Sequence, residues 1–220
     1  MAPEPVVHLR GAVALVDRFP ALAGVDLDVD AGEVVLVRGA NGAGKTTLLR
    51  TCAGLLPVTS GTARVLGVDL VATPAAVRRR VGLLGHATHL YGELTVRENV
   101  RFWARAAGAS TADGNAALER LGVPDRLHEV AVRSLSTGQR RRVSFAAMVA
   151  RRPELWLLDE PHAGLDAAGR DVVDDLIAEA STSGATVLFA SHELERAESV
   201  AGRVVTIAGG AVVVAGGGSS

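Results

Sequence analysis

The residues best suited to chemistry form a glycine-rich run, Gly39–Thr46, with the sequence Gly-Ala-Asn-Gly-Ala-Gly-Lys-Thr. It matches the P-loop pattern G-x-x-x-x-G-K-[S/T], in which backbone N–H groups and a lysine hold the phosphates of a nucleotide. We expect Lys45 to neutralise the β- and γ-phosphates and the Thr46 hydroxyl to ligate Mg²⁺. The predicted phosphate-binding residues are Gly39, Ala40, Asn41, Gly42, Ala43, Gly44, Lys45, Thr46 and Thr47.

Two adjacent carboxylates end an apolar run further along the chain. Leu155–Leu158 is followed directly by Asp159 and Glu160. Ionised groups at the end of a buried strand are costly unless they are paired or bind a metal. Behind a P-loop, this pattern predicts that Asp159 holds Mg²⁺ through its water shell and that Glu160 polarises the attacking water.

Alternating strands and helices are expected to position these residues. Val34–Val37, Leu155–Leu158 and Thr186–Phe189 have the composition of buried strands, and Thr46–Cys52 can be helical. Strand, helix and strand in succession imply a parallel sheet covered on both faces, and therefore an α/β fold. The helix expected between the last two strands is indicated by Val172, Val173, Leu176, Ile177 and Ala180.

The rest of the chain follows other patterns. Three N-terminal segments, Val6–Leu9, Leu27–Val29 and Thr62–Leu66, are typical of antiparallel strands. Thr95 and Glu98 form a capping box ahead of a helix, and further helices are expected at 116–121 and 138–150. We therefore expect a single domain over residues 1–220. Its core comprises about 1–86 and 152–220, and about 87–151 form a helical insert.

Composition narrows the classes of function. The formal net charge of −1 gives no electrostatic argument for nucleic acid or for insertion into anionic lipid. The one cysteine, Cys52, excludes an internal disulfide framework and fits a reducing compartment. No signal peptide is visible, and the uncharged stretch from Val204 onward is rich in glycine, which favours a hairpin and tail over a membrane span. Any membrane role is therefore expected to come through a partner.

The segment Leu135–Gln139, Leu-Ser-Thr-Gly-Gln, narrows the family. It resembles the LSGGQ signature of ABC ATPases, with Thr137 in place of the first glycine. A serine, a glycine and a new helix N-terminus form an anion site, although an ordinary serine N-cap would have the same local sequence. The resemblance implies that Ser136, Gly138 and Gln139 close over the γ-phosphate held by the opposite subunit of a homodimer.

The remaining motifs occur in the order of that family. Ala163–Asp166 resembles its D-loop, and His192, after an expected strand, resembles the switch histidine that contacts the γ-phosphate. The resemblance covers nearly the whole chain and implies a P-loop NTPase fold of the RecA-like type. It also implies an ATPase that uses ATP and Mg²⁺, in which Glu160, His192 and Lys45 are catalytic. Thr46 and Asp159 would bind the metal.

Two positions depart from the family pattern. The aromatic residue that usually stacks on adenine would fall near Val16, and the nearest aromatic residue is Phe19. The usual glutamine of the Q-loop is replaced by His86, whose neutral imidazole could still carry a water-mediated hydrogen bond toward Mg²⁺. The base contact and the role of His86 therefore stay open at this point.

The second departure indicates a subfamily. Gly85-His86, together with Leu94–Phe102 and Leu135–Arg142, resembles the CcmA-type ATPases of haem exporters for cytochrome c biogenesis. That resemblance implies separate integral-membrane subunits and a location on the inner face of the cell membrane. Phe102 and Trp103 could dock the membrane subunit or belong to the core. The arginine run 140–142 is typical of a solvated face, or could attract ATP.

Other readings compete with this one. An ABC exporter for a drug or a polysaccharide has the same cassette, because the cassette does not touch the cargo. A soluble ABC protein acting on ribosomes or DNA usually carries two cassettes or a long coiled-coil insert, and this sequence has neither. A nucleotide-binding regulator without hydrolysis is disfavoured by Glu160 and His192.

Overall fold

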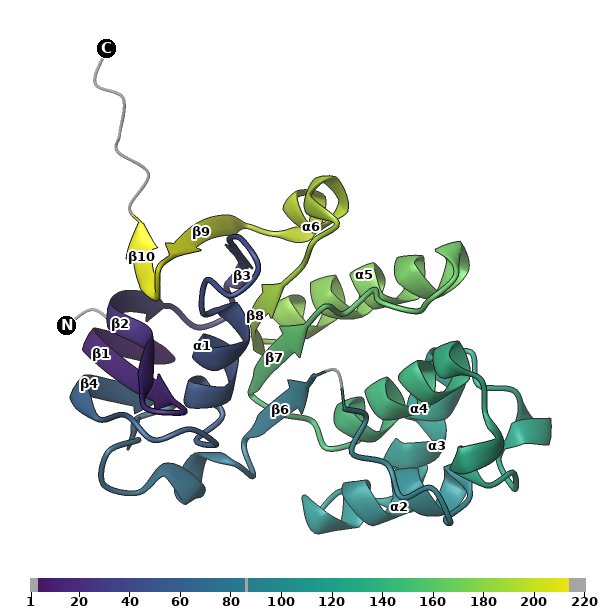
Figure 1. Ribbon diagram of the computed structural model, residues 1–220. Helices are drawn as coiled ribbons and strands as arrows, with labels where there is room; N and C mark the ends of the chain where they lie inside the picture. Colours follow the sequence, from purple (N-terminus) through teal and green to yellow (C-terminus); the bar gives the residue numbers. More distant parts are fainter. Residues whose placement is uncertain (1–3, 86, 214–220) are drawn as a thin grey trace.

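Figure 1 shows the protein as a computed structural model that describes residues 4–85 and 87–213. Its largest element is a six-stranded sheet with the strand order β10-β9-β3-β8-β7-β6. Neighbouring strands of this sheet are parallel, except for the hairpin of β9 and β10. The strands are β3 (Val34–Arg38), β6 (Val81–Leu84), β7 (Leu155–Asp159), β8 (Thr186–Ala190), β9 (Arg203–Ala208) and β10 (Ala211–Val213).

A second sheet is antiparallel and has the order β2-β1-β4-β5. Helix α1 (Lys45–Cys52) contacts strands of both sheets and so joins them. The three antiparallel segments expected near the N-terminus all lie in this second sheet, which confirms their prediction. Its strands are β1 (Val7–Val16), β2 (Phe19–Val29), β4 (Ser60–Val65) and β5 (Val68–Asp69).

Both faces of the six-stranded sheet are covered, because alternate residues of its central strands enter different apolar clusters. In β7, Leu155 and Leu157 pack with α1 and the antiparallel sheet, whereas Trp156 and Leu158 face the opposite cluster. Every residue of β7 and β8 is buried. This two-sided burial explains why the strands are continuous apolar runs rather than alternating ones.

The remaining helices lie mostly on the other side of the sheet from α1. Each of α2, α3 and α4 begins with a capping box, at Thr95, Ser110 and Ser136 respectively. The box at Thr95 was predicted. These helices are α2 (Val96–Ala106), α3 (Thr111–Arg120), α4 (Thr137–Val149), α5 (Ala167–Thr182) and α6 (Leu194–Val200); short 3₁₀ turns occur at Pro74–Val77, Asp125–Leu127 and Val132–Ser134.

The prediction for α3 was wrong at its start. The apolar spacing indicated a helix over 116–121, but the helix begins five residues earlier, at Thr111. Its first turn is polar and is fixed by Ser110, whose side chain accepts a hydrogen bond from the Asp113 backbone N–H while the Asp113 carboxylate accepts from Ser110. Hydrophobic periodicity did not predict this turn, because its residues are polar and a capping box stabilises it.

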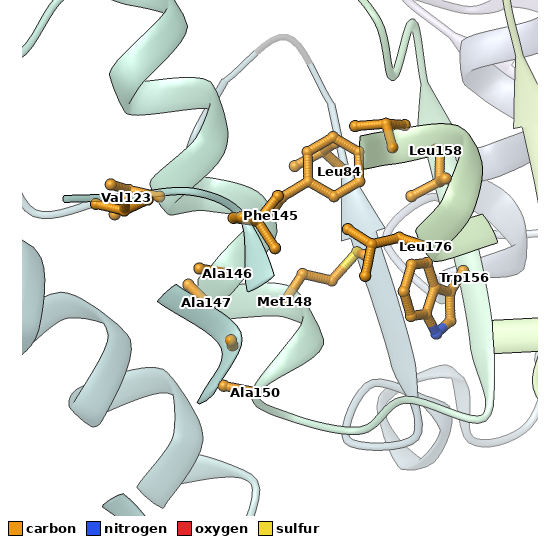
Figure 2. Close-up of a cluster of buried hydrophobic side chains, with 14 of the residues drawn as sticks. Leu84, Val123, Phe145, Ala146, Ala147, Met148, Ala150, Trp156, Leu158 and Leu176 are labelled. Carbon is orange, nitrogen blue, oxygen red and sulfur yellow. The ribbon is translucent and has the colours of Figure 1, made fainter. Parts of the chain in front are cut away.

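Helix α4 attaches the group of α2, α3 and α4 to the rest of the protein. Figure 2 shows Phe145 and Met148 of α4 in one cluster with Leu84 of β6, Trp156 of β7 and Leu176 of α5. The Phe145 side chain is fully buried there. The helical group is therefore joined to the sheet largely through one helix.

The predicted fold class is confirmed: an α/β core with a mainly parallel sheet, an antiparallel N-terminal sheet and a group of inserted helices. The expected C-terminal hairpin is formed by β9 and β10, and the tail after residue 213 lies outside the described residues. Within residues 4–85 and 87–213, none of the helices has both the length and the apolar character needed to cross a bilayer.

Candidate functional site

The P-loop connects β3 to α1, and two of its glycines are required by close backbone contacts. A Cβ on Gly39 would lie 2.2 Å from the carbonyl oxygen of Ile207, and one on Gly44 would lie 2.6 Å from that of Ala21. Gly44 also has a φ of 111°, in the left-handed region, at the N-cap of α1. No side chain caps this helix and its first turn contains no acidic residue. Its N-terminal N–H groups are therefore directed at an anion site.

Lys45 is held inside this loop. Its Nζ donates to the carbonyl oxygens of Gly39, at 2.7 Å, and of Ala40, at 3.1 Å, and the residue is 8% exposed. The loop lines one side of a cavity of about 240 Å³. That cavity is lined by Ala21, Asn41, Gly42, Gly44, Lys45, Thr46, Thr47, Asp159, Glu160 and His192.

Thr46 and Asp159 both line this cavity and meet there, although they are far apart in the sequence. The Thr46 hydroxyl donates to Asp159 Oδ2 at 2.7 Å, and Asp159 ends β7 with 4% exposure. The described residues contain no group of three or more His, Cys, Asp or Glu side chains suited to a metal. A hydroxyl and one carboxylate fit Mg²⁺ that arrives with a nucleotide, because this ion keeps waters and phosphate oxygens as most of its ligands.

Glu160 and His192 face each other at the ends of β7 and β8. His192 Nε2 lies 3.5 Å from Glu160 Oε1, and the His192 backbone N–H donates to Glu160 Oε2 at 3.0 Å. Glu160 has a φ of 51°, a left-handed conformation that costs a non-glycine residue about 1–3 kcal/mol. Such strain is typical of functional sites, and here it directs the carboxylate to the cavity that contains Lys45.

Arg141 is a further residue at this site, and its role was missed from the sequence. The interpretation of the run 140–142 as a solvated face is wrong for Arg141, which is only 6% exposed. Its guanidinium donates to three backbone carbonyls: Gly85 at 2.6 Å, Asp159 at 3.0 Å and Glu160 at 2.5 Å. Helical spacing could have revealed it, because Arg141, Phe145 and Met148 recur at the i, i+4, i+7 spacing of one buried helix face.

Burial lowers the pKa of Arg141 to about 10, and the nearby Asp159 and Glu160 carboxylates oppose that shift. The guanidinium therefore remains charged at neutral pH while its hydrogen bonds fix the backbone on both sides of the Glu160 side chain. It joins α4, the end of β6 and the end of β7.

Comparison with known proteins identifies the family, because residues 22–163 match the ABC transporter family. The chain belongs to that family. The cassette is 42% identical over 170 residues to the cytochrome c biogenesis ATP-binding export protein CcmA of Rhodopseudomonas palustris, covering 77% of this chain and 83% of CcmA. It is 35% identical over 209 residues to the daunorubicin/doxorubicin resistance protein DrrA of Streptomyces peucetius, covering 93% of this chain and 63% of DrrA.

Solved structures agree with this assignment. An ATP-binding subunit of an ABC transporter has a TM-score of 0.88 and 27% identity, covering 95% of this chain and 88% of that one. A dimeric post-hydrolysis structure of an ATP-binding cassette with ADP and Pi has a TM-score of 0.86, covering 94% of this chain and 97% of that one. Its identity to this chain is 24%, so this likeness shows the fold alone. The protein is thus an ATP-binding subunit of an ABC transporter.

The signature residues of the cassette are not brought to its own phosphate cavity. Ser136 and Gln139 form the capping box of α4, where the Ser136 Oγ accepts from the Gln139 backbone N–H at 3.2 Å. Neither these residues nor Gly138 line the cavity that contains Lys45. Ser136 can therefore serve both as the N-cap of α4 and as a contact for the γ-phosphate of another subunit. A hydroxyl that accepts a hydrogen bond as a cap still has its own proton to donate.

The two departures from the family pattern concern His86 and the adenine contact. His86 lies outside the described residues. Val16 and Phe19 pair directly across the hairpin of β1 and β2, and the Phe19 side chain is 76% exposed. Phe19 does not line the phosphate cavity, but it precedes by two residues Ala21, which does.

Proposed function

We propose that this cassette hydrolyses ATP in a homodimer and drives the membrane subunits of a haem exporter for cytochrome c biogenesis. The observation that carries the hydrolysis is the position of the Glu160 carboxylate, held against His192 in the cavity that also contains Lys45. An acceptor for a water proton and a cation for the γ-phosphate thereby occupy one site.

The mechanism follows from these positions. The P-loop and the N-terminus of α1 bind the phosphates, and Lys45 exchanges its loop carbonyls for β- and γ-phosphate oxygens. Glu160 orients a water in line with the γ-phosphorus, and His192 stabilises charge on the γ-phosphoryl group. Mg²⁺, when bound, would be held by Thr46 and Asp159 and would neutralise phosphate charge.

The dimer completes each site. Ser136 is exposed, and α4 begins immediately after it. We expect Ser136, Gly138 and Gln139 of one cassette to contact the γ-phosphate held by the P-loop of the other. Loss of the γ-phosphate removes the anion that links the two subunits, so the dimer opens after hydrolysis. That opening would drive the membrane partner.

The haem assignment is supported by two segments within the helical insert. Leu94–Phe102 and Leu135–Arg142 resemble CcmA-type ATPases, and a relative named CcmA is 42% identical to this chain. Export of a drug is the second candidate, since a relative named for daunorubicin resistance covers more of the chain. The place of action would be the inner face of the cell membrane, reached through the membrane subunits, with no nucleic acid involved. A soluble ABC ATPase is the remaining alternative.

An apolar groove beside α2 is the proposed contact with the membrane subunit. A cavity of about 350 Å³ lies between the core and the helical insert, and Leu55, Leu83, Trp103 and Met148 line it. Beside it the ring of Phe102, which is 44% exposed, meets Trp103 edge to face with centroids 5.3 Å apart. Trp103 is half-buried and packs against the core, so it serves both structure and groove, whereas Phe102 is available to a partner.

A pull-down from native membranes tests the partner and the cargo together. The tagged chain is expected to recover cytochrome c maturation subunits with haem, as read by mass spectrometry and haem absorbance. Phe102→Asp should lose them while still binding ATP, because a charge would be buried in the contact. Val204→Asp is the matched control, since Val204 is 40% exposed on β9, far along the sheet from β6. Recovery of a different permease would contradict haem export, and recovery of no membrane protein would favour a soluble ATPase.

We expect Phe19 to supply the base contact that Val16 cannot. Phe19→Ala should weaken ATP binding about ten-fold, because stacking on an aromatic ring is worth roughly 1–3 kcal/mol per base. Phe19→Tyr should bind ATP like the parent, and Val16→Ala is the matched control across the hairpin. Equilibrium titration with a fluorescent ATP analogue measures this. Parent-like affinity in Phe19→Ala would mean that the base lies elsewhere.

A further inference from the structure

The loop that follows Glu160 contains a buried histidine that the hydrolysis mechanism does not use. His162 is 1% exposed, and its Nε2 lies 2.7 Å from Asp174 Oδ1 on α5. Since a carboxylate accepts only, Nε2 carries the proton in this contact. The other ring nitrogen, Nδ1, is buried and has no hydrogen-bond partner among the residues that the structure describes. Among the described residues, the His162 ring therefore makes its hydrogen bond to Asp174 alone.

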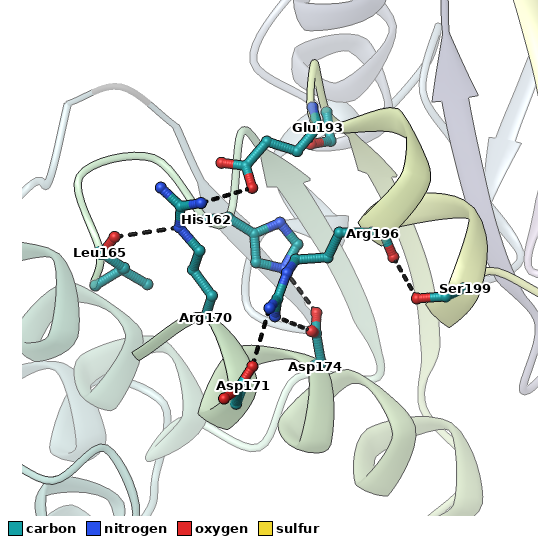
Figure 3. Close-up of polar contacts among 9 residues, drawn as sticks. His162, Leu165, Arg170, Asp171, Asp174, Glu193, Arg196 and Ser199 are labelled. Atoms are coloured by element: carbon teal, nitrogen blue, oxygen red, sulfur yellow. Dashed lines mark hydrogen bonds and ion pairs between the residues drawn. The ribbon is translucent and has the colours of Figure 1, made fainter. Parts of the chain in front are cut away.

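Asp174 also holds the segment that follows His192. Arg196 of α6 donates to Asp174 Oδ2 and, at 3.0 Å, to Asp171 Oδ1 (Figure 3). Helix α6 has seven residues and no side-chain cap, so it is too short to be stable without tertiary contacts. Asp174 therefore connects the loop after Glu160 with the helix after His192.

A second connection runs parallel to the first. Arg170 lies four residues before Asp174 and so on the same side of α5. Its Nε donates to the Leu165 carbonyl oxygen at 3.2 Å, and its NH1 donates to Glu193 Oε2 at 3.0 Å. Figure 3 shows both connections side by side, each reaching from the 161–166 loop across α5 to the residues after His192.

We propose that these two connections, here called the α5 bridge (His162, Asp174, Arg196, Arg170 and Glu193), set the position of His192 against Glu160. The bridge joins the loop after one of these residues to the segment after the other, while His192 itself is 57% exposed and contacts Glu160 at 3.5 Å. His162 and Asp174 are positioning residues, since neither lines the cavity that contains Lys45. The inference rests on the proposed hydrolysis at Glu160.

Measurements of kcat and of the Kd for ATP in variants of the α5 bridge test the proposal, because a positioning role should change kcat alone. Asp174→Asn and His162→Leu are expected to lower kcat at saturating ATP about ten-fold or more, because small misplacements of reacting groups are costly. The Kd for ATP should stay at the parent value, since the P-loop is untouched. His162→Gln keeps an N–H for Asp174 and should recover most of kcat. Asp175→Asn, an exposed neighbour on α5, is the matched control and should resemble the parent.

A second readout does not depend on turnover. The ring resonances of His192, assigned by their loss in His192→Gln, are expected to shift in Asp174→Asn and to remain in place in Asp175→Asn. An unchanged His192 signal, or a kcat within about two-fold of the parent in both bridge variants, would overturn the proposal. So would a joint loss of kcat, ATP affinity and Tm, which indicates general destabilisation. If the parent hydrolyses no ATP and the His192 signal still shifts, the proposed hydrolysis fails and the positional link stands.

Discussion

Glu160→Gln is expected to bind ATP with the affinity of the parent, to hydrolyse it about 10³-fold more slowly, and to accumulate as a dimer. The amide keeps the size of the side chain and an oxygen that can accept from the His192 backbone N–H, as Glu160 does at 3.0 Å. It loses the negative charge that polarises the attacking water. Binding is unaffected because the P-loop contacts and Lys45 remain.

Steady-state phosphate release and size-exclusion chromatography with ATP measure the two effects. Lys45→Ala is the informative control: it should lose both ATP binding and the ATP-dependent dimer, because the anion site loses its cation. Hydrolysis by Glu160→Gln at the parent rate would remove Glu160 from the role of water activation. A monomeric variant with bound ATP would instead contradict the composite dimer site.

Arg141→Met is expected to lower the free energy of unfolding by about 3 kcal/mol and to slow hydrolysis. Three backbone carbonyls, those of Gly85, Asp159 and Glu160, would lose their donor, and the hydrogen bond to Asp159 is buried. Part of the lost free energy of unfolding is regained in this variant. Because burial lowers the pKa of Arg141 to about 10, the charged form opposes folding at every pH below that value, and methionine removes this cost. Hydrolysis slows because the strained backbone of Glu160 is no longer held.

Urea unfolding measures the stability change, and turnover of the folded fraction measures the second effect. Arg126→Met is the matched control, because Arg126 is an exposed arginine in the helical insert and should leave the midpoint unchanged. Arg141→Lys keeps a charge with fewer donors and should fall between Arg141→Met and the parent. Unfolding of Arg141→Met at the parent midpoint would show that the three carbonyls find other partners.

The parts of the fold that could be predicted are those determined by residues close together in the sequence. The apolar runs at Val34, Leu155 and Thr186 each became a buried parallel strand, because a strand that is covered on both faces is apolar at successive positions. Gly39 and Gly44 of the P-loop motif indicated their loop, because a Cβ at either position would collide with backbone oxygen atoms. The capping box at Thr95 indicated its helix.

Features that depend on distant partners and belong to no recognisable motif were not predictable. Arg141 belongs to a run of three arginines, and only the approach of β6 and β7 makes the middle one buried. His162 gives no local sign of its burial, which comes from packing against α5. The pairing of Thr46 with Asp159 could be expected from the two motifs, and the structure brings them to 2.7 Å.

The attachment of the helical insert through α4 has an evolutionary consequence. The proposed hydrolysis site lies at the ends of β3, β7 and β8, whereas the proposed membrane contact uses α2 and its neighbours, and α4 joins the two. Substitutions on the outer surface of α2 can therefore accumulate without disturbing the phosphate site. Lineages could exchange one membrane partner for another through substitutions on that surface alone. Relatives named for drug resistance and for cytochrome c biogenesis are 35% and 42% identical to this chain.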